Sequence, residues 1–121
     1  MALFAVALGA FGAHGLKSIL TPDRIAIFET GVRYHFYHSF AIFLIALTLK
    51  SYQSRWIQWS GCLFFIGILF FSGSLYLLAC RDVLNIAHWT WLGPITPIGG
   101  MCFIIGWLLA AIGINKAIKI S

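Results

Sequence analysis

Residues 56–80 read WIQWSGCLFFIGILFFSGSLYLLAC, and none of these 25 consecutive residues carries a formal charge. A helix needs about 20 mainly apolar residues to cross the hydrocarbon core of a bilayer, which is about 30 Å thick. Trp56 and Trp59 lie where aromatic side chains anchor a span at the interface, and Arg81 with Asp82 ends the apolar run. These residues therefore predict one transmembrane helix.

Three further apolar stretches flank this span. Residues 34–50 contain few polar side chains, and a six-residue polar turn at 50–55 leads from them to residue 56. Such a short turn predicts that the two spans are antiparallel neighbours. Residues 97–114 and residues 1–15 supply the other two apolar stretches. We therefore expect an all-α polytopic membrane protein, a single domain built as a bundle of about four transmembrane helices, at about 1–15, 34–50, 56–80 and 97–114.

The first of these spans is the shortest. No Lys or Arg precedes Lys17, so the segment lacks the positive region of a cleavable signal peptide and is expected to be retained. The thirteen residues before His14 are fewer than a crossing requires. We expect a thin or tilted first span, or one that starts upstream.

The overall composition is that of a chain covered by lipid rather than water. Of its 121 residues 61% are hydrophobic and only 9% are charged, against about 25% in a soluble domain. The net charge of +5 comes from scattered Lys and Arg residues, which excludes a nucleic-acid stripe and suits loops beside anionic lipid. Cys62, Cys80 and Cys102 are odd in number and lie in or beside apolar runs, so we predict free thiols.

Two helix starts can be predicted from proline. Residues 17–33 form the charged first loop, in which Thr21 is a suitable N-cap and Pro22 a suitable first helical residue. A helix starting there could run directly into the second span. Thr96 before Pro97 has the same pattern and predicts the start of the fourth span. The alternative for that segment is an ion or anion contact at a half-helix N-terminus.

Small residues recur along two spans. Gly99, Gly106 and Gly113 are seven residues apart, with Ala110 between the last two, which predicts a close helix-packing face. On the first span, Ala5 and Gly9 begin a second such stripe that ends at Ala13. A neighbouring helix should approach closely along each stripe.

A polar cluster is predicted where the chain enters the second span. Glu29 and Arg33 are four residues apart, the helical spacing of an ion pair, and Tyr34 and His38 repeat that spacing. One interpretation is that the cluster locks the helix bundle. The other is proton or ion handling, because His titrates near neutrality and ionisable groups at membrane depth often mark conduction paths.

The remaining polar side chains give weaker signals. Ser72 and Ser74 lie in the middle of span three, where hydroxyls bond a carbonyl one turn back or a neighbouring helix. Four histidines could converge on a metal or haem in a helical bundle: His14, His35, His38 and His88. No pair of them has a zinc-site signature such as HExxH, and the GxSxG elbow is absent. We predict no metal, cofactor or catalytic residue, and no enzymatic activity.

Four stretches together carry a family resemblance. They are GAFGAHGL at 9–16, FETGVRY at 28–34 with His38, FSGSLY at 71–76, and TPIGG at 96–100 with Gly106 and Trp107. In order and spacing they resemble the YgdD family of small membrane proteins, also called domain of unknown function 423 and related to animal transmembrane protein 256. The positions that match the family pattern are polar or proline: His14, Glu29, Arg33, Tyr34, His38, Ser72, Ser74, Tyr76, Thr96 and Pro97.

The resemblance implies a four-span protein of the bacterial inner membrane and no established reaction. We therefore predict an accessory or interaction module, either a homo-oligomer or bound to another membrane protein, with a proton, ion or small-solute pathway through Glu29, Arg33 and His38 as the alternative. Basic residues are equally numerous on the two sides of the predicted bundle. If Arg33 is neutralised by Glu29, the positive-inside rule places both termini in the cytoplasm.

Overall fold

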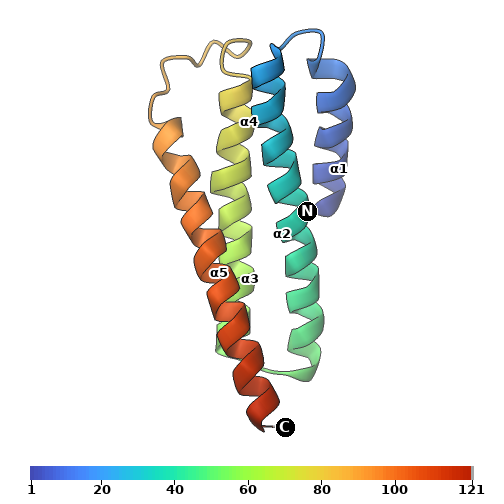
Figure 1. The fold of residues 1–121 in the computed structure, drawn as a ribbon, viewed down its shortest axis with the longest axis vertical. Helices are drawn as coiled ribbons and strands as arrows, with labels where there is room; N and C mark the ends of the chain where they lie inside the picture. Colours follow the sequence, from blue (N-terminus) through green and yellow to red (C-terminus); the bar gives the residue numbers. More distant parts are fainter. Residues whose placement is uncertain (121) are drawn as a thin grey trace.

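The computed structural model describes residues 1–120, which form helices joined by turns and by a longer loop at residues 80–91. Figure 1 shows the long helices standing side by side as an up-and-down bundle, with α1 lying against one end of α2. The helical segments are α1 (Ala2–Phe11), η1 (Gly12–Leu16), α2 (Pro22–Ser51), α3 (Arg55–Gly67), η2 (Ile68–Ser72), α4 (Gly73–Ala79) and α5 (Leu92–Ile120). The predicted all-α membrane fold is confirmed.

Three of the helices are long and apolar enough to cross a membrane: Pro22–Ser51, Arg55–Ala79 and Leu92–Lys119. The second of these is a single rod in which η2 is a π-helical segment between α3 and α4. Ala2–Leu16 is a shorter apolar helix, and its last turn, η1, is also π-helical.

Helix α2 begins at the predicted residue and ends in the predicted turn. Thr21 is extended at the N-cap, Pro22 is the first helical residue, and the Thr21 carbonyl accepts a hydrogen bond from the Ile25 amide at 3.0 Å. The helix then runs 30 residues without interruption, so the predicted second span and the charged segment before it form one element. Only residues 52–54 separate α2 from α3, which makes the two helices an antiparallel hairpin (Figure 1).

The predicted start of the fourth span at Thr96 is wrong. Helix α5 begins at Leu92, which places Thr96 in its second turn and Pro97 inside the helix. Pro94 lies in the first turn, where amide donors have no intrahelical partner, so the start is compatible with proline. Pro97 removes one later hydrogen bond, a loss that membrane helices tolerate when neighbours compensate.

The small-residue stripe of α5 lies against large residues of the α3–η2 rod. A Cβ added at Gly113 would lie 2.6 Å from Ile57, and one at Gly106 would lie 2.7 Å from Phe64. At Gly99 the Cβ would collide with the backbone of Phe71, where the Cα lies at 2.8 Å.

The three glycines, seven residues apart on α5, therefore pack against three large residues that are seven residues apart on the rod. The two series run in opposite directions along the sequence. Between these contacts, one pair has the large residue on α5 and the glycine on the rod. Phe103 fills the space beside Gly67, where an added Cβ would lie 2.5 Å from the Phe103 ring. Ala110 is also buried on this face. The pairing is the large-and-small interlocking expected of closely packed membrane helices.

Two apolar clusters hold the rest of the bundle together. The first lies among α2, α3 and α5 and includes Ile45, Ile57, Phe64 and Phe103. The second lies where α1 and η1 meet α2 and α4, and it is built around Leu16, Phe28 and Ala79 among other residues. Both therefore lie between helices.

The first helix uses most of its predicted stripe. Ala5 is fully buried, and a Cβ at Gly9 would lie 3.2 Å from Val32 of α2. Ala13 is exposed, and Gly12 continues the contact instead, against Phe28. The packing face of this helix is therefore formed by residues 5, 9 and 12.

Candidate functional site

His38 lies in the interior of the bundle with both ring nitrogens engaged. Its Nδ1 lies 2.8 Å from the Tyr34 carbonyl oxygen, and its Nε2 lies 3.2 Å from the indole Nε1 of Trp107. A carbonyl can only accept and an indole N–H can only donate. His38 is therefore the neutral tautomer that carries its proton on Nδ1.

Aromatic rings enclose the His38 imidazole. The ring of Phe103 is stacked on it with the centroids 3.5 Å apart, and the ring of Phe64 lies 5.4 Å away. Tyr34 lies near the same group, 4.7 Å from Phe71 and 6.1 Å from Phe103 by ring centroids. Because its surroundings are apolar and its hydrogen bonds are complete, His38 ties α2 to α5 as a structural residue.

A second buried histidine joins α2 to α4. His35 Nδ1 lies 3.1 Å from the Tyr76 hydroxyl, while its Nε2 is buried without a hydrogen-bond partner among the described residues. The Tyr76 ring also packs on Phe28, with centroids 4.9 Å apart. From the sequence, Tyr76 is a match to the family pattern, and His35 is both a possible metal ligand and, at a spacing of three from His38, a member of the predicted polar cluster. The spacing of three from His35 to His38 is the one signal that both face inward.

The two mid-span serines behave differently. Ser74 donates to the Phe71 carbonyl at 2.9 Å, as predicted for a hydroxyl bonding one turn back, and its oxygen lies 2.7 Å from Thr96 Oγ1. Because its single proton goes to Phe71, Ser74 accepts the proton of Thr96. Thr96 therefore links α5 to α4 rather than capping a helix. Ser72 is fully buried, and its hydroxyl has no partner within residues 1–120.

The structure does not bring Glu29, Arg33 and His38 together. Glu29 and Arg33 are exposed on the outer face of α2, whereas His38 faces inward. Arg33 donates to the Thr30 hydroxyl at 3.3 Å, and the ion pairs of the described chain do not include the predicted one between Glu29 and Arg33. Both line a shallow hollow of about 210 Å³ between α1 and α2, beside Gly9 and Gly12.

The four histidines do not converge. His14 is exposed in the η1 turn, and His88 lies edge-on to Trp89 in the loop before α5. Over residues 1–120, no three His, Cys, Asp or Glu side chains are grouped as metal ligands. The convergence of all four histidines on one metal or haem is therefore not seen among the described residues.

Cations and anions are paired at the end of the bundle where α2 begins. Arg24 donates to Asp82 at 3.1 Å and to the Leu78 carbonyl at 3.1 Å, so it closes the last turn of α4. Arg81 Nε lies 3.6 Å from the other oxygen of Asp82. All three acidic residues of the sequence, Asp23, Glu29 and Asp82, belong to this half of the bundle.

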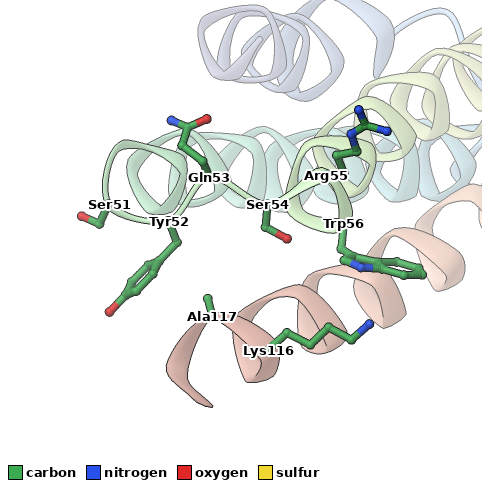
Figure 2. A pocket seen from close by; sticks show the side chains of 8 residues that line it. All are labelled: Ser51, Tyr52, Gln53, Ser54, Arg55, Trp56, Lys116 and Ala117. Carbon is green, nitrogen blue, oxygen red and sulfur yellow. The ribbon is translucent and has the colours of Figure 1, made fainter. Parts of the chain in front are cut away.

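The opposite end is purely basic and contains a pocket of about 580 Å³. Its walls are the turn from α2 to α3 and the last turns of α5 (Figure 2): Ser51, Tyr52, Gln53, Ser54, Arg55, Trp56, Lys116 and Ala117. The Lys116 ammonium lies 4.6 Å from the centre of the Trp56 ring, a cation–π contact. The sequence identified the turn but gave no sign that α5 would close it.

Taken together, these features define a small polytopic helical membrane protein whose interior is packed and whose charged groups lie mainly at the two ends. Its three long apolar helices and the shorter first helix form one bundle.

Comparison with known proteins identifies the family. Residues 8–100 match the family described as "Protein of unknown function (DUF423)", to which the chain belongs. It is 43% identical to a UPF0382 membrane protein of Staphylococcus saprophyticus over 115 residues, covering 95% of this chain and 90% of the relative. It is 41% identical to the membrane protein YwdK of Bacillus subtilis, covering 95% and 89%.

The relative in Escherichia coli, the inner membrane protein YgdD, is 37% identical over 108 residues, which cover 89% of this chain and 78% of the relative. No solved structure matches the chain. The names of these relatives agree with the membrane location expected from the sequence.

Proposed function

We propose that the protein is a membrane-embedded interaction module that associates with a second copy of itself through the exposed face of α2. The observation that carries this proposal is the placement of Glu29 and Arg33. Both are exposed on α2 directly before the span predicted at residues 34–50, where the helix enters the bilayer. Ionisable groups that approach the hydrocarbon are costly against lipid and usually face protein or water.

The charges on this face are complementary to the same face of another copy. Glu29 and Arg33 differ in height by one helical turn, about 6 Å. A two-fold axis along the membrane normal leaves these heights unchanged, so the carboxylate and guanidinium of different copies meet, twice, when each Arg33 side chain extends one turn along the interface toward Glu29 of the other copy. Both charges are neutralised in the low-dielectric interface, and Tyr37, which is 59% exposed on the same face, extends the contact.

The geometry gives less support to a proton or ion pathway. A relay needs ionisable groups within reach of one another, and His38 lies on the opposite side of α2 from Glu29 and Arg33. Five hollows of the described surface, three at the bundle ends or the loops and two along helix grooves, are lined without His35 or His38.

We further propose that the end carrying the basic pocket faces the cytoplasm. Lys50, Arg55, Lys116 and Lys119 have no acidic residue nearby in the sequence, whereas Arg24 and Arg81 at the other end are paired with Asp82. Lys and Arg near the ends of spans favour the cytoplasmic side, and we infer that the four at the pocket end outweigh Lys17 and Arg33, the two at the other end that form no ion pair with an acidic residue among the described residues. A Val83→Cys variant lacking the native cysteines should react in whole cells with a membrane-impermeant maleimide. Reaction only after lysis contradicts this orientation.

Self-association is tested with charge reversal. Glu29→Arg and Arg33→Glu each place like charges opposite one another, so each variant alone should lose co-purification of two differently tagged copies in mild detergent. Coexpression of the two variants restores complementary charges between copies and should restore co-purification. A pair that forms only within one chain cannot give this rescue.

Lys50→Glu is the matched control, because Lys50 is exposed on α2 at the other end of the helix. It should associate like the wild type. Glu29→Gln with Arg33→Gln, which removes both charges, is the second variant if a reversed charge prevents insertion. Undiminished association of Glu29→Arg, of Arg33→Glu or of the double glutamine variant, or a wild type whose tagged copies never co-purify, overturns the proposal.

A further inference from the structure

The basic pocket and a second hollow share the hairpin of α2 and α3. The second hollow, of about 590 Å³, is an apolar groove along the two helices. Its lining begins next to the turn at Leu49 and Gln58 and continues to Ile42 and Phe65. A polar, cationic pocket at the end of a span is thus followed by an apolar groove toward the bilayer centre.

The pocket offers hydrogen-bond donors and positive charge without any acid. Figure 2 shows Tyr52, Ser54 and Trp56 pointing toward α5, where Lys116 lies, and Arg55 pointing to the other side of the turn. The nearest acidic residues in the chain, Glu29 and Asp82, belong to the opposite half of the bundle. The field in this pocket therefore favours an anion.

Arg55 lies between the pocket and the groove. It lines the pocket, and Gln58, three residues later and therefore one turn along the same side of α3, lines the groove. A ligand whose anionic group reaches Arg55 can thus place an apolar chain beside Gln58 and Phe65.

We propose that the pocket and groove together bind one anionic glycerophospholipid of the surrounding leaflet. Its phosphate lies beside Lys116 and accepts hydrogen bonds from the hydroxyls of Tyr52 and Ser54, and the Arg55 side chain turns toward it from the other side of the turn. One acyl chain lies in the groove between α2 and α3. Basic pockets between transmembrane helices bind anionic headgroups in this manner. The site lies at headgroup depth because α2 ends and α3 begins there.

The test is thermal unfolding of the full chain, purified in mild detergent and supplied with defined lipids. Phosphatidylglycerol should raise the unfolding temperature, and phosphatidylcholine at the same concentration should not. Arg55→Gln with Lys116→Gln should weaken the apparent affinity for phosphatidylglycerol roughly thirtyfold, about fivefold for each basic residue. Lys17→Gln, at the opposite end, is the matched control and should keep the full response.

The groove is tested separately. Ala46 lines it and is exposed, so Ala46→Leu fills space without disturbing the core. The Ala46→Leu variant keeps Arg55 and Lys116. Long-chain phosphatidylglycerol should nevertheless raise its unfolding temperature less than it raises that of the wild type. Equal stabilisation by the two lipids, an undiminished response of the double variant, or an equal response to inorganic phosphate alone overturns the lipid assignment.

Discussion

The indole Nε1 of Trp107 on α5 donates a hydrogen bond of 3.2 Å to Nε2 of His38 on α2. The Nδ1 proton of the same imidazole is held by the Tyr34 carbonyl at 2.8 Å. Two helices that are far apart in sequence are thereby joined through one neutral side chain. A proton added at Nε2 would break the bond to Trp107 and leave a charge among the rings of Phe64 and Phe103.

Loss of the indole donor should destabilise the bundle. Trp107→Phe leaves Nε2 of His38 buried without a partner, at an expected cost of ~1–3 kcal/mol in the free energy of unfolding. Denaturant unfolding in micelles measures the change. Trp59→Phe is the control, because Trp59 is 62% exposed on the outside of the bundle. Equal stability of the two variants would show that the hydrogen bond is not important.

Replacing a glycine by alanine should change the stability of the bundle by different amounts at different positions. At Gly99 the added Cβ meets the backbone of Phe71, which cannot rotate away, so Gly99→Ala should cost ~1–3 kcal/mol. At Gly73 nothing lies within 4 Å, and Gly73→Ala should be neutral or stabilise by up to about 1 kcal/mol through helix propensity. Thermal unfolding of both variants in the same detergent measures the contrast. Similar losses at the two positions contradict the interlocked packing.

The recurrence of glycine every seven residues is visible in the sequence, and so is the transmembrane character of residues 56–80. The sequence does not show which residues of the α3–η2 rod pack against these glycines. Ile57, Phe64 and Phe71 also recur every seven residues, but many apolar residues of the rod do so, and only packing selects these three. The π-helical segment η2, which contributes the Phe71 backbone contact, has no signature in an apolar run.

Spacing along the sequence does not determine which of several possible contacts or helix starts forms. Glu29 and Arg33 have the spacing of an ion pair, yet Arg33 bonds Thr30 within its own helix face. Thr96 and Pro97 have the pattern of a helix start, but Pro94 offers the same signal three residues earlier, and the helix begins before both. Proline is compatible with the first turn of a helix but does not fix the residue at which the helix begins.

The Ser74–Thr96 hydrogen bond should give a measurable coupling. Its oxygens are 2.7 Å apart in the interface of α4 and α5. In a double-mutant cycle of Ser74→Ala, Thr96→Val and both together, the coupling should be about 0.6 kcal/mol, with about 1.7 as the upper end for membrane proteins. Reversible unfolding in micelles supplies the four free energies. Additive effects would mean that the two hydroxyls act independently.

Cys80 provides a pH-dependent probe of the end where α4 stops. Burial raises the pKa of the Cys80 thiol, so its thiolate fraction at a given pH is smaller than that of an ordinary cysteine. Since the thiolate is the reactive form, maleimide labelling of a variant with Cys62→Ser and Cys102→Ser should accelerate at higher pH than labelling of an exposed cysteine. Val83→Cys in a background that also lacks Cys80 is the reference, because Val83 is 52% exposed three residues away. The two rates should converge as the pH rises through the raised pKa. Coincident pH profiles would mean that the turn after α4 opens to water and that Arg24 does not hold it closed.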